Sequence, residues 1–143
     1  VGYSLEDLDG DGSMELLLGA VGAPEIYAMY TMKDGVETQV IDAGERSSYR
    51  LGTDGVFINQ GSNSAAQSGT MLFTFENGEL HFQDGLVSDF SVDEKNPWFY
   101  VKDQNWDSST YEALDTESAE AIIAQLNANV RPISYIPFSE YQS

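Results

Sequence analysis

Short apolar stretches separated by glycine-containing turns run along most of this 143-residue chain. Three of the turns join Asp or Asn to Gly, at Asp34-Gly35, Asp54-Gly55 and Asn77-Gly78. These dipeptides accept the positive φ angles that tight hairpin turns require. They predict three β-hairpins, which join residues 26–32 to 36–41, 49–51 to 56–58, and 71–76 to 79–83.

Alternation of apolar and polar residues supports this interpretation. Met71, Phe73 and Phe75 fall on one face of their strand, and Leu80 and Phe82 fall on one face of the next. Turn signals recur about every ten to twenty residues, which is typical of an antiparallel meander rather than of strand-helix-strand units.

One segment near the C-terminus, residues 117–129, has the periodicity of a helix. Its apolar residues recur at steps of three and four: Ala119, Ile122, Ile123, Leu126 and Val130. Thr116 is the predicted N-cap, and acidic residues in the first turn favour the helix dipole. We expect the helix to pack on one face of the sheet, to end by Pro132, and to be followed by an edge strand over residues 133–138.

Residues 59–69 are small and polar, and the sequence predicts a loop there. Residues 97–102 are predicted as a further strand, and residues 103–115 as an irregular segment. Together these elements predict a mainly β (α+β) fold, an antiparallel meander of hairpins with one C-terminal amphipathic helix. We expect residues 1–143 to form a single domain and to be a fragment of a longer protein; the sequence leaves open whether a signal or anchor lies upstream of Val1.

The charge of the chain narrows the choice of partners. Twenty-four acids against six bases give a net charge of −18, which repels phosphate backbones and anionic lipids and attracts cations. We therefore expect no nucleic-acid partner. There is no cysteine, and no window of eighteen apolar residues predicts a membrane span in this chain.

The acidic stretch Asp7-Leu8-Asp9-Gly10-Asp11-Gly12-Ser13-Met14-Glu15 has the pattern of a calcium loop. Calcium takes six to eight oxygen ligands, and carboxylates at the first, third and fifth places of a loop converge on one ion. The predicted ligands are the side chains of Asp7, Asp9 and Asp11, the carbonyl of Ser13, and the carboxylate of Glu15. A solvated acidic turn is the simpler alternative.

The loop is not an EF-hand, because the twelfth place, where an EF-hand carries a bidentate glutamate, is Leu18. Residues 3–19 instead resemble the Asp-x-Asp-x-Asp-Gly-x-x-Asp/Glu loop of integrin alpha-chain and VCBS-type repeats. That resemblance implies a calcium-binding hairpin closed at the ninth place by Glu15. The ion is then expected to hold the fold rather than to act as a sensor switch.

A wider resemblance rests on motifs spread along the chain, namely Lys33-Asp34-Gly35, Gly44-Glu45-Arg46, Gly61-Ser62-Asn63, Asn96-Pro97-Trp98-Phe99 and the late acidic helix. With the acidic loop, this order is similar to that of uncharacterised secreted proteins or lipoproteins of gut Firmicutes. The resemblance implies a bacterial origin and a secreted or cell-surface location.

Little in the sequence favours catalysis. His81 is the single histidine, and alternation places it on the outward face of its strand. No nucleophile elbow, phosphate-binding glycine loop or zinc-spaced set is present. We therefore lean against an enzyme and predict no catalytic residues.

Aromatic residues suggest a different ligand. Trp98, Tyr100, Trp106 and Tyr111 lie near several acids and are candidate residues for carbohydrate binding, because sugar rings stack on aromatic faces. The alternative is that Trp98 and Tyr100 belong to the core and that Trp106 covers an edge. The sequence and these resemblances thus predict a calcium-stabilised extracellular binding or interaction module of unknown ligand, protein or carbohydrate, or else a carbohydrate-binding or carbohydrate-active domain that uses residues 98–111.

Overall fold

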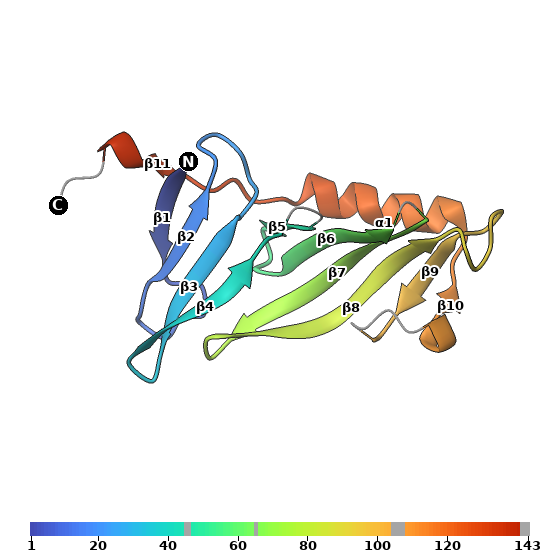
Figure 1. The fold of residues 1–143 in the computed structure, drawn as a ribbon, viewed down its shortest axis with the longest axis horizontal. Coiled ribbons are helices and arrows are strands. Elements are labelled where there is room, and N and C mark those ends of the chain that lie inside the picture. Colours follow the sequence, from blue (N-terminus) through green and yellow to red (C-terminus); the bar gives the residue numbers. More distant parts are fainter. Residues whose placement is uncertain (45–46, 65, 104–107, 141–143) are drawn as a thin grey trace.

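A computed structural model describes residues 1–44, 47–64, 66–103 and 108–140. In these residues the chain is mainly β, with two antiparallel sheets and one α-helix (Figure 1). The predicted mainly β (α+β) class and the meander of hairpins are confirmed, because successive strands are neighbours in each sheet.

The first sheet, sheet A, is formed by five strands in the order β11-β1-β2-β3-β4. Their bounds are β1 Gly2–Glu6, β2 Glu15–Gly19, β3 Ala28–Lys33, β4 Val36–Asp42 and β11 Ile136–Pro137. The β3–β4 turn has φ angles of 53° at Asp34 and 77° at Gly35, as the Asp-Gly dipeptide predicted.

The second sheet, sheet B, is formed by six strands in the order β10-β9-β8-β7-β6-β5. Their bounds are β5 Ser47–Leu51, β6 Phe57–Ser64, β7 Gln67–Glu76, β8 Glu79–Asp89, β9 Trp98–Val101 and β10 Glu112–Ala113. A short 3-10 helix, η1 (Ser108–Thr110), precedes β10. The β7–β8 turn has φ angles of 52° at Asn77 and 76° at Gly78, so this predicted hairpin is also confirmed.

The predicted loop over residues 59–69 is wrong. Residues up to Ser64 belong to β6, and β7 starts at Gln67, so that Gly61 pairs with Gly69 and Ser62 with Ser68. Each of these strands has a second partner, β5 or β8. The ladder hydrogen bonds to two neighbours therefore override the weak strand propensity of small polar residues.

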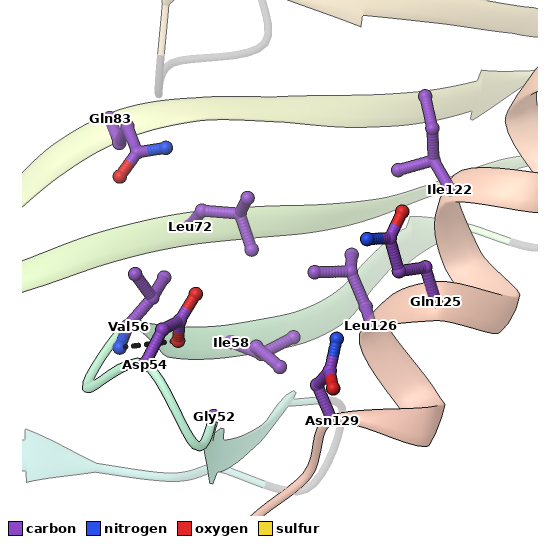
Figure 2. A pocket seen from close by; sticks show the side chains of 10 residues that line it. All are labelled: Gly52, Asp54, Val56, Ile58, Leu72, Gln83, Ile122, Gln125, Leu126 and Asn129. Atoms are coloured by element: carbon purple, nitrogen blue, oxygen red, sulfur yellow. Dashed lines mark hydrogen bonds between the residues drawn. The ribbon is translucent and has the colours of Figure 1, made fainter.

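The helix α1 spans Thr116–Ala128, close to the predicted bounds. Its N-cap is Asp115 and not the predicted Thr116: the Asp115 carboxylate accepts the Ser118 N–H at 2.7 Å. The cap residue Asn129 ends the helix before Pro132 is reached. As predicted, the helix packs on a sheet: Ile122 and Leu126 lie beside Leu72 and other residues of sheet B (Figure 2).

After the helix, the chain returns to sheet A. Only Ile136–Pro137 forms the predicted edge strand, and Phe138–Glu140 forms a second 3-10 helix, η2. Pro137 lies at the edge of the sheet, where its missing N–H costs least. A Cβ atom on Gly19 would overlap the ring of Tyr135, so this contact requires glycine.

The main hydrophobic core lies between the two sheets. It contains Leu17, Met29 and Ile41 of sheet A and Leu51, Phe57 and Phe75 of sheet B, together with Ile133 and Tyr135. A second cluster, Met71, Val87 and Val101, continues along the same face of sheet B. The β1–β2 loop is attached to the main core through the side chain of Leu8.

Candidate metal site

The acidic stretch forms the loop of the β1–β2 hairpin, residues 7–14, with Glu15 as the first residue of β2. Gly10 and Gly12 have φ angles of 73° and 87°, which glycine adopts without strain. A strand on each side of the loop is what the sequence predicted in place of the helices of an EF-hand.

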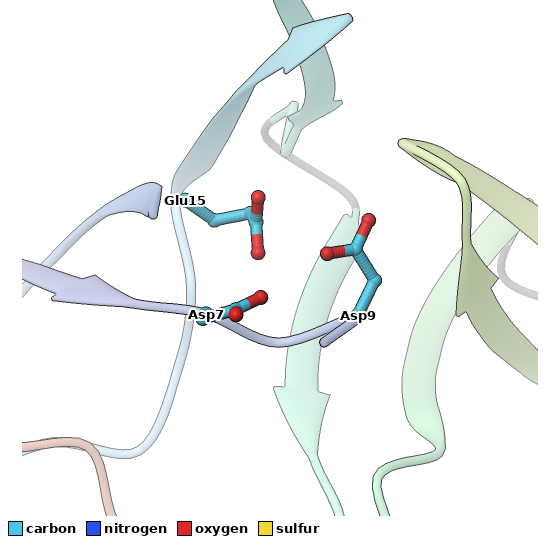
Figure 3. Close-up of side chains that lie close together, drawn as sticks. All are labelled: Asp7, Asp9 and Glu15. Carbon is cyan, nitrogen blue, oxygen red and sulfur yellow. The ribbon is translucent and has the colours of Figure 1, made fainter. Parts of the chain in front are cut away.

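Three carboxylates converge in this hairpin (Figure 3). One oxygen each of Asp7, Asp9 and Glu15 lie within 4.8 Å of one another. Carboxylate oxygens are the ligands that calcium prefers, at 2.3–2.6 Å from the ion. The donor set therefore fits a hard divalent cation, and these three residues would be the ones to hold it.

Glu15 is the buried member of this group, with 0% of its surface exposed. One of its oxygens accepts the Leu8 N–H at 2.7 Å and the other accepts the hydroxyl of Thr31 at 2.9 Å. Burial raises the pKa of the Glu15 carboxyl above its ordinary 4.5, although these two hydrogen bonds oppose the rise. Strand β2 thus holds a carboxylate at the inner edge of the loop.

Asp7 sets the curvature of the loop. Its Oδ1 accepts the Gly10 N–H and its Oδ2 accepts the Gly12 N–H, both at 2.9 Å. The backbone N–H groups of these two glycines therefore hold the Asp7 carboxylate in a fixed orientation within the loop.

Asp9 connects the loop to sheet B. Its Oδ2 accepts the N–H of Gly78, in the β7–β8 turn, at 3.2 Å. Burial and the neighbouring side chain of Asp11 raise the pKa of the Asp9 carboxyl. The sequence identified Asn77-Gly78 as a turn, but no local pattern relates that turn to a loop so far away in the chain.

The other two predicted ligands take different positions. Asp11 lies beside Asp9, but it does not belong to the group of three converging carboxylates. Its Oδ1 accepts the Ser13 N–H at 2.8 Å. Asp11 is thus exposed in the outer turn of the loop and Ser13 is half-buried there, and their role as ligands stays a prediction.

Glu6, just before the loop, is only partly exposed. Its carboxylate forms an ion pair with the Arg131 guanidinium through both oxygens, with one N–O distance of 3.1 Å. Arg131 in turn donates its backbone N–H to the carbonyl of Leu51. The pair therefore ties the start of the loop to the segment after α1.

The three described candidate aromatic residues lie on two different faces of sheet B. Trp98 and Tyr100 are half-buried on one face of β9, and the Tyr100 hydroxyl donates to Asp84 at 2.9 Å. Tyr111 stacks on Phe99, which points to the opposite face, with ring centroids 4.9 Å apart. Trp106 lies outside the described residues. The fully buried positions of β9 are Phe99 and Val101, so Trp98 and Tyr100 are not the core pair that the alternative expected.

Comparison with known proteins found no matching family model, no matching curated protein and no matching solved structure. Within the described residues, no helix is long and apolar enough to cross a membrane. His81 is exposed on β8, as its place in the alternation predicted.

Proposed function

We propose that this chain is a non-enzymatic, calcium-stabilised module that acts outside the cell. The observation that carries the proposal is the convergence of Asp7, Asp9 and Glu15 within 4.8 Å in a strand-flanked loop. Three carboxylates this close repel one another, and a divalent cation between them removes the repulsion.

The position of Asp9 supports a structural role for the ion. Because the same carboxylate accepts the N–H of Gly78, an ion held by Asp9 and Glu15 joins the first hairpin of sheet A to the β7–β8 turn of sheet B. Extracellular calcium modules commonly bind with dissociation constants of about 10⁻⁴ to 10⁻³ M. Such an affinity suits the secreted or cell-surface location that the resemblance implies.

The test is the melting temperature of the protein in chelator and in millimolar calcium. At ten times its dissociation constant, a ligand that binds only the folded state adds about 1.4 kcal/mol of stability. For a domain of this size the melting temperature then rises by about 5 °C. We expect Asp7→Asn with Asp9→Asn to abolish this rise.

A matched control separates site binding from general screening of the negative charge. Glu37→Gln with Glu120→Gln removes the same charge from exposed residues of β4 and α1. This variant should keep the calcium-dependent rise. The proposal fails if wild type melts at the same temperature in chelator and in calcium, or if the control variant loses the rise equally.

A further inference from the structure

The outward face of sheet A carries an apolar surface. The strand register places Leu5, Leu16 and Tyr30 side by side on this face, with Leu18 and Met32 on the same face of their strands. Ile136 of β11 joins them, because it pairs with Tyr3. We call these six residues, Leu5, Leu16, Leu18, Tyr30, Met32 and Ile136, the outer patch.

Much of the outer patch is open to solvent. Leu5 is 56% exposed, Met32 47% and Ile136 42%. In β2 the run Leu16-Leu17-Leu18 places leucine on both faces of the sheet, and only Leu17 reaches the core. Strands with continuous apolar runs are typical of sheets that are covered on both faces.

Sheet B shows how this chain covers a sheet face. There α1 lies along the strands (Figure 1), with its Ile122 and Leu126 on the same side of the sheet as Leu72 (Figure 2). Leu86 lines the same space between helix and sheet. No α-helix of the described residues covers sheet A. The short helix η2 reaches its outward face at one point, where the ring of Phe138 meets that of Tyr3 in β1 with centroids 5.6 Å apart. The apolar face of a sheet is buried by a second sheet or by helices, and on the outer face of sheet B the element that does so is α1.

Charge indicates which helix would fit. On the same outward face, β4 carries Glu37 opposite Met32 and Asp42 opposite Ala28, and both acids are exposed. The β4 side of the outer patch is therefore an acidic border. A second copy of the chain also carries a net charge of −18, and repulsion between the two copies opposes self-association. A helix with basic residues along one side is instead attracted to the acidic border.

We propose that the outer patch binds an amphipathic helix of another protein, with an apolar face against Leu5, Leu16 and Met32 and lysine or arginine along β4. This site is separate from the acidic loop and does not require it to bind calcium.

The test uses a dye-labelled synthetic helix of about 18 residues, about 27 Å long, with leucine on one face and lysine on the other. Fluorescence anisotropy should show binding to wild type. Leu5→Ser with Met32→Ser should weaken it at least tenfold. Glu37→Gln with Asp42→Asn should weaken it severalfold and reduce its salt dependence. A peptide with glutamate in place of lysine should not bind.

The matched control is Phe90→Ser with Val92→Ser, which removes two equally exposed apolar side chains from the turn after β8 without changing the net charge. It should bind the peptide as wild type does. Melting curves establish that each variant is folded. The proposal is overturned if wild type does not bind the peptide. It is also overturned if the Leu5→Ser, Met32→Ser variant and the Phe90→Ser, Val92→Ser variant bind it equally, because the peptide is then held by charge and not by the outer patch. A dimer in sedimentation equilibrium that Leu5→Ser with Met32→Ser dissociates also overturns it, because the occupant is then a second copy.

Discussion

The carboxylate of Asp9 accepts a hydrogen bond from the backbone N–H of Gly78, 69 residues later in the chain. This contact joins the tip of the first hairpin to the tip of the β7–β8 hairpin, and therefore sheet A to sheet B. A metal ion bound by Asp9 would therefore stabilise the packing of the two sheets as well as the first hairpin.

Hydrogen exchange at Gly78 should report on the loop. We expect calcium to slow exchange of the Gly78 amide, because an ion that orders Asp9 also orders the acceptor of that N–H. The amide of Gly35, at the same position of the β3–β4 turn, is the internal control and should change little. NMR exchange rates with calcium and with chelator measure both. Equal slowing at the two glycines would indicate global stabilisation without a local link.

Replacement of Glu15 separates burial of the carboxylate from binding of the ion. In chelator at pH 7 we expect Glu15→Gln to be within about 1 kcal/mol of wild type in unfolding free energy, because the neutral amide removes a buried charge and keeps partners for Leu8 and Thr31. In calcium it should lose the stabilisation that wild type gains. Urea unfolding under both conditions measures this.

Thr31→Val is the companion variant, since it removes the hydrogen bond to Glu15 and retains the carboxylate. Thr31→Val should lower the unfolding free energy by about 1–2 kcal/mol both in chelator and in calcium. Calcium should still stabilise this variant as much as it stabilises wild type. If calcium stabilised the Glu15→Gln protein as much as it stabilises wild type, the assignment of Glu15 as a ligand would be contradicted.

Asp89 should make stability depend on pH. It is 3% exposed at the end of β8, and although burial alone would raise its pKa, hydrogen bonds from Ser91, Tyr111 and Val92 outweigh burial and lower it below the ordinary 3.8. A lowered folded-state pKa gives stability that is present above pH 3.8 and is lost as the pH falls through the folded value. Asp89→Asn should therefore cost about 1–3 kcal/mol at pH 7 and progressively less below pH 4.

Denaturant unfolding from pH 7 to pH 2.5 measures this difference. Asp42→Asn, at an exposed position at the end of β4, is the control and should remain close to wild type throughout. A pH-independent cost for Asp89→Asn would mean that its charge plays no part in holding the turn after β8.

The start of α1 offers a paired test of the two N-cap candidates. Asp115 accepts the Ser118 N–H, and this contact lowers the pKa of Asp115. Asp115→Ala should destabilise the protein by about 1 kcal/mol, as is usual for loss of an N-cap. Thr116→Ala, inside the first turn, should change stability by less than about 0.5 kcal/mol. The reverse order in urea unfolding would restore Thr116 as the cap.

Local chemistry allowed the hairpins to be predicted from the sequence. Asp34-Gly35 and Asn77-Gly78 adopt the positive φ angles that their residue types favour, and the strands on either side follow directly. The strand over residues 59–64 could not be predicted in this way. Its small polar residues carry no strand signal of their own, and pairing with β5 and β7 decides their conformation.

In the candidate metal site, too, some features depend on local sequence and others on tertiary packing. The sequence by itself determined the acidic loop, its glycines and its flanking strands, because these depend on neighbours in the chain. Only the tertiary structure decided that Glu15 is buried against Thr31, that Asp11 stays outside the converging group, and that Gly78 contacts Asp9. It also left the apolar face of sheet A exposed. These features depend on how two sheets pack, and packing brings together residues that no local pattern relates.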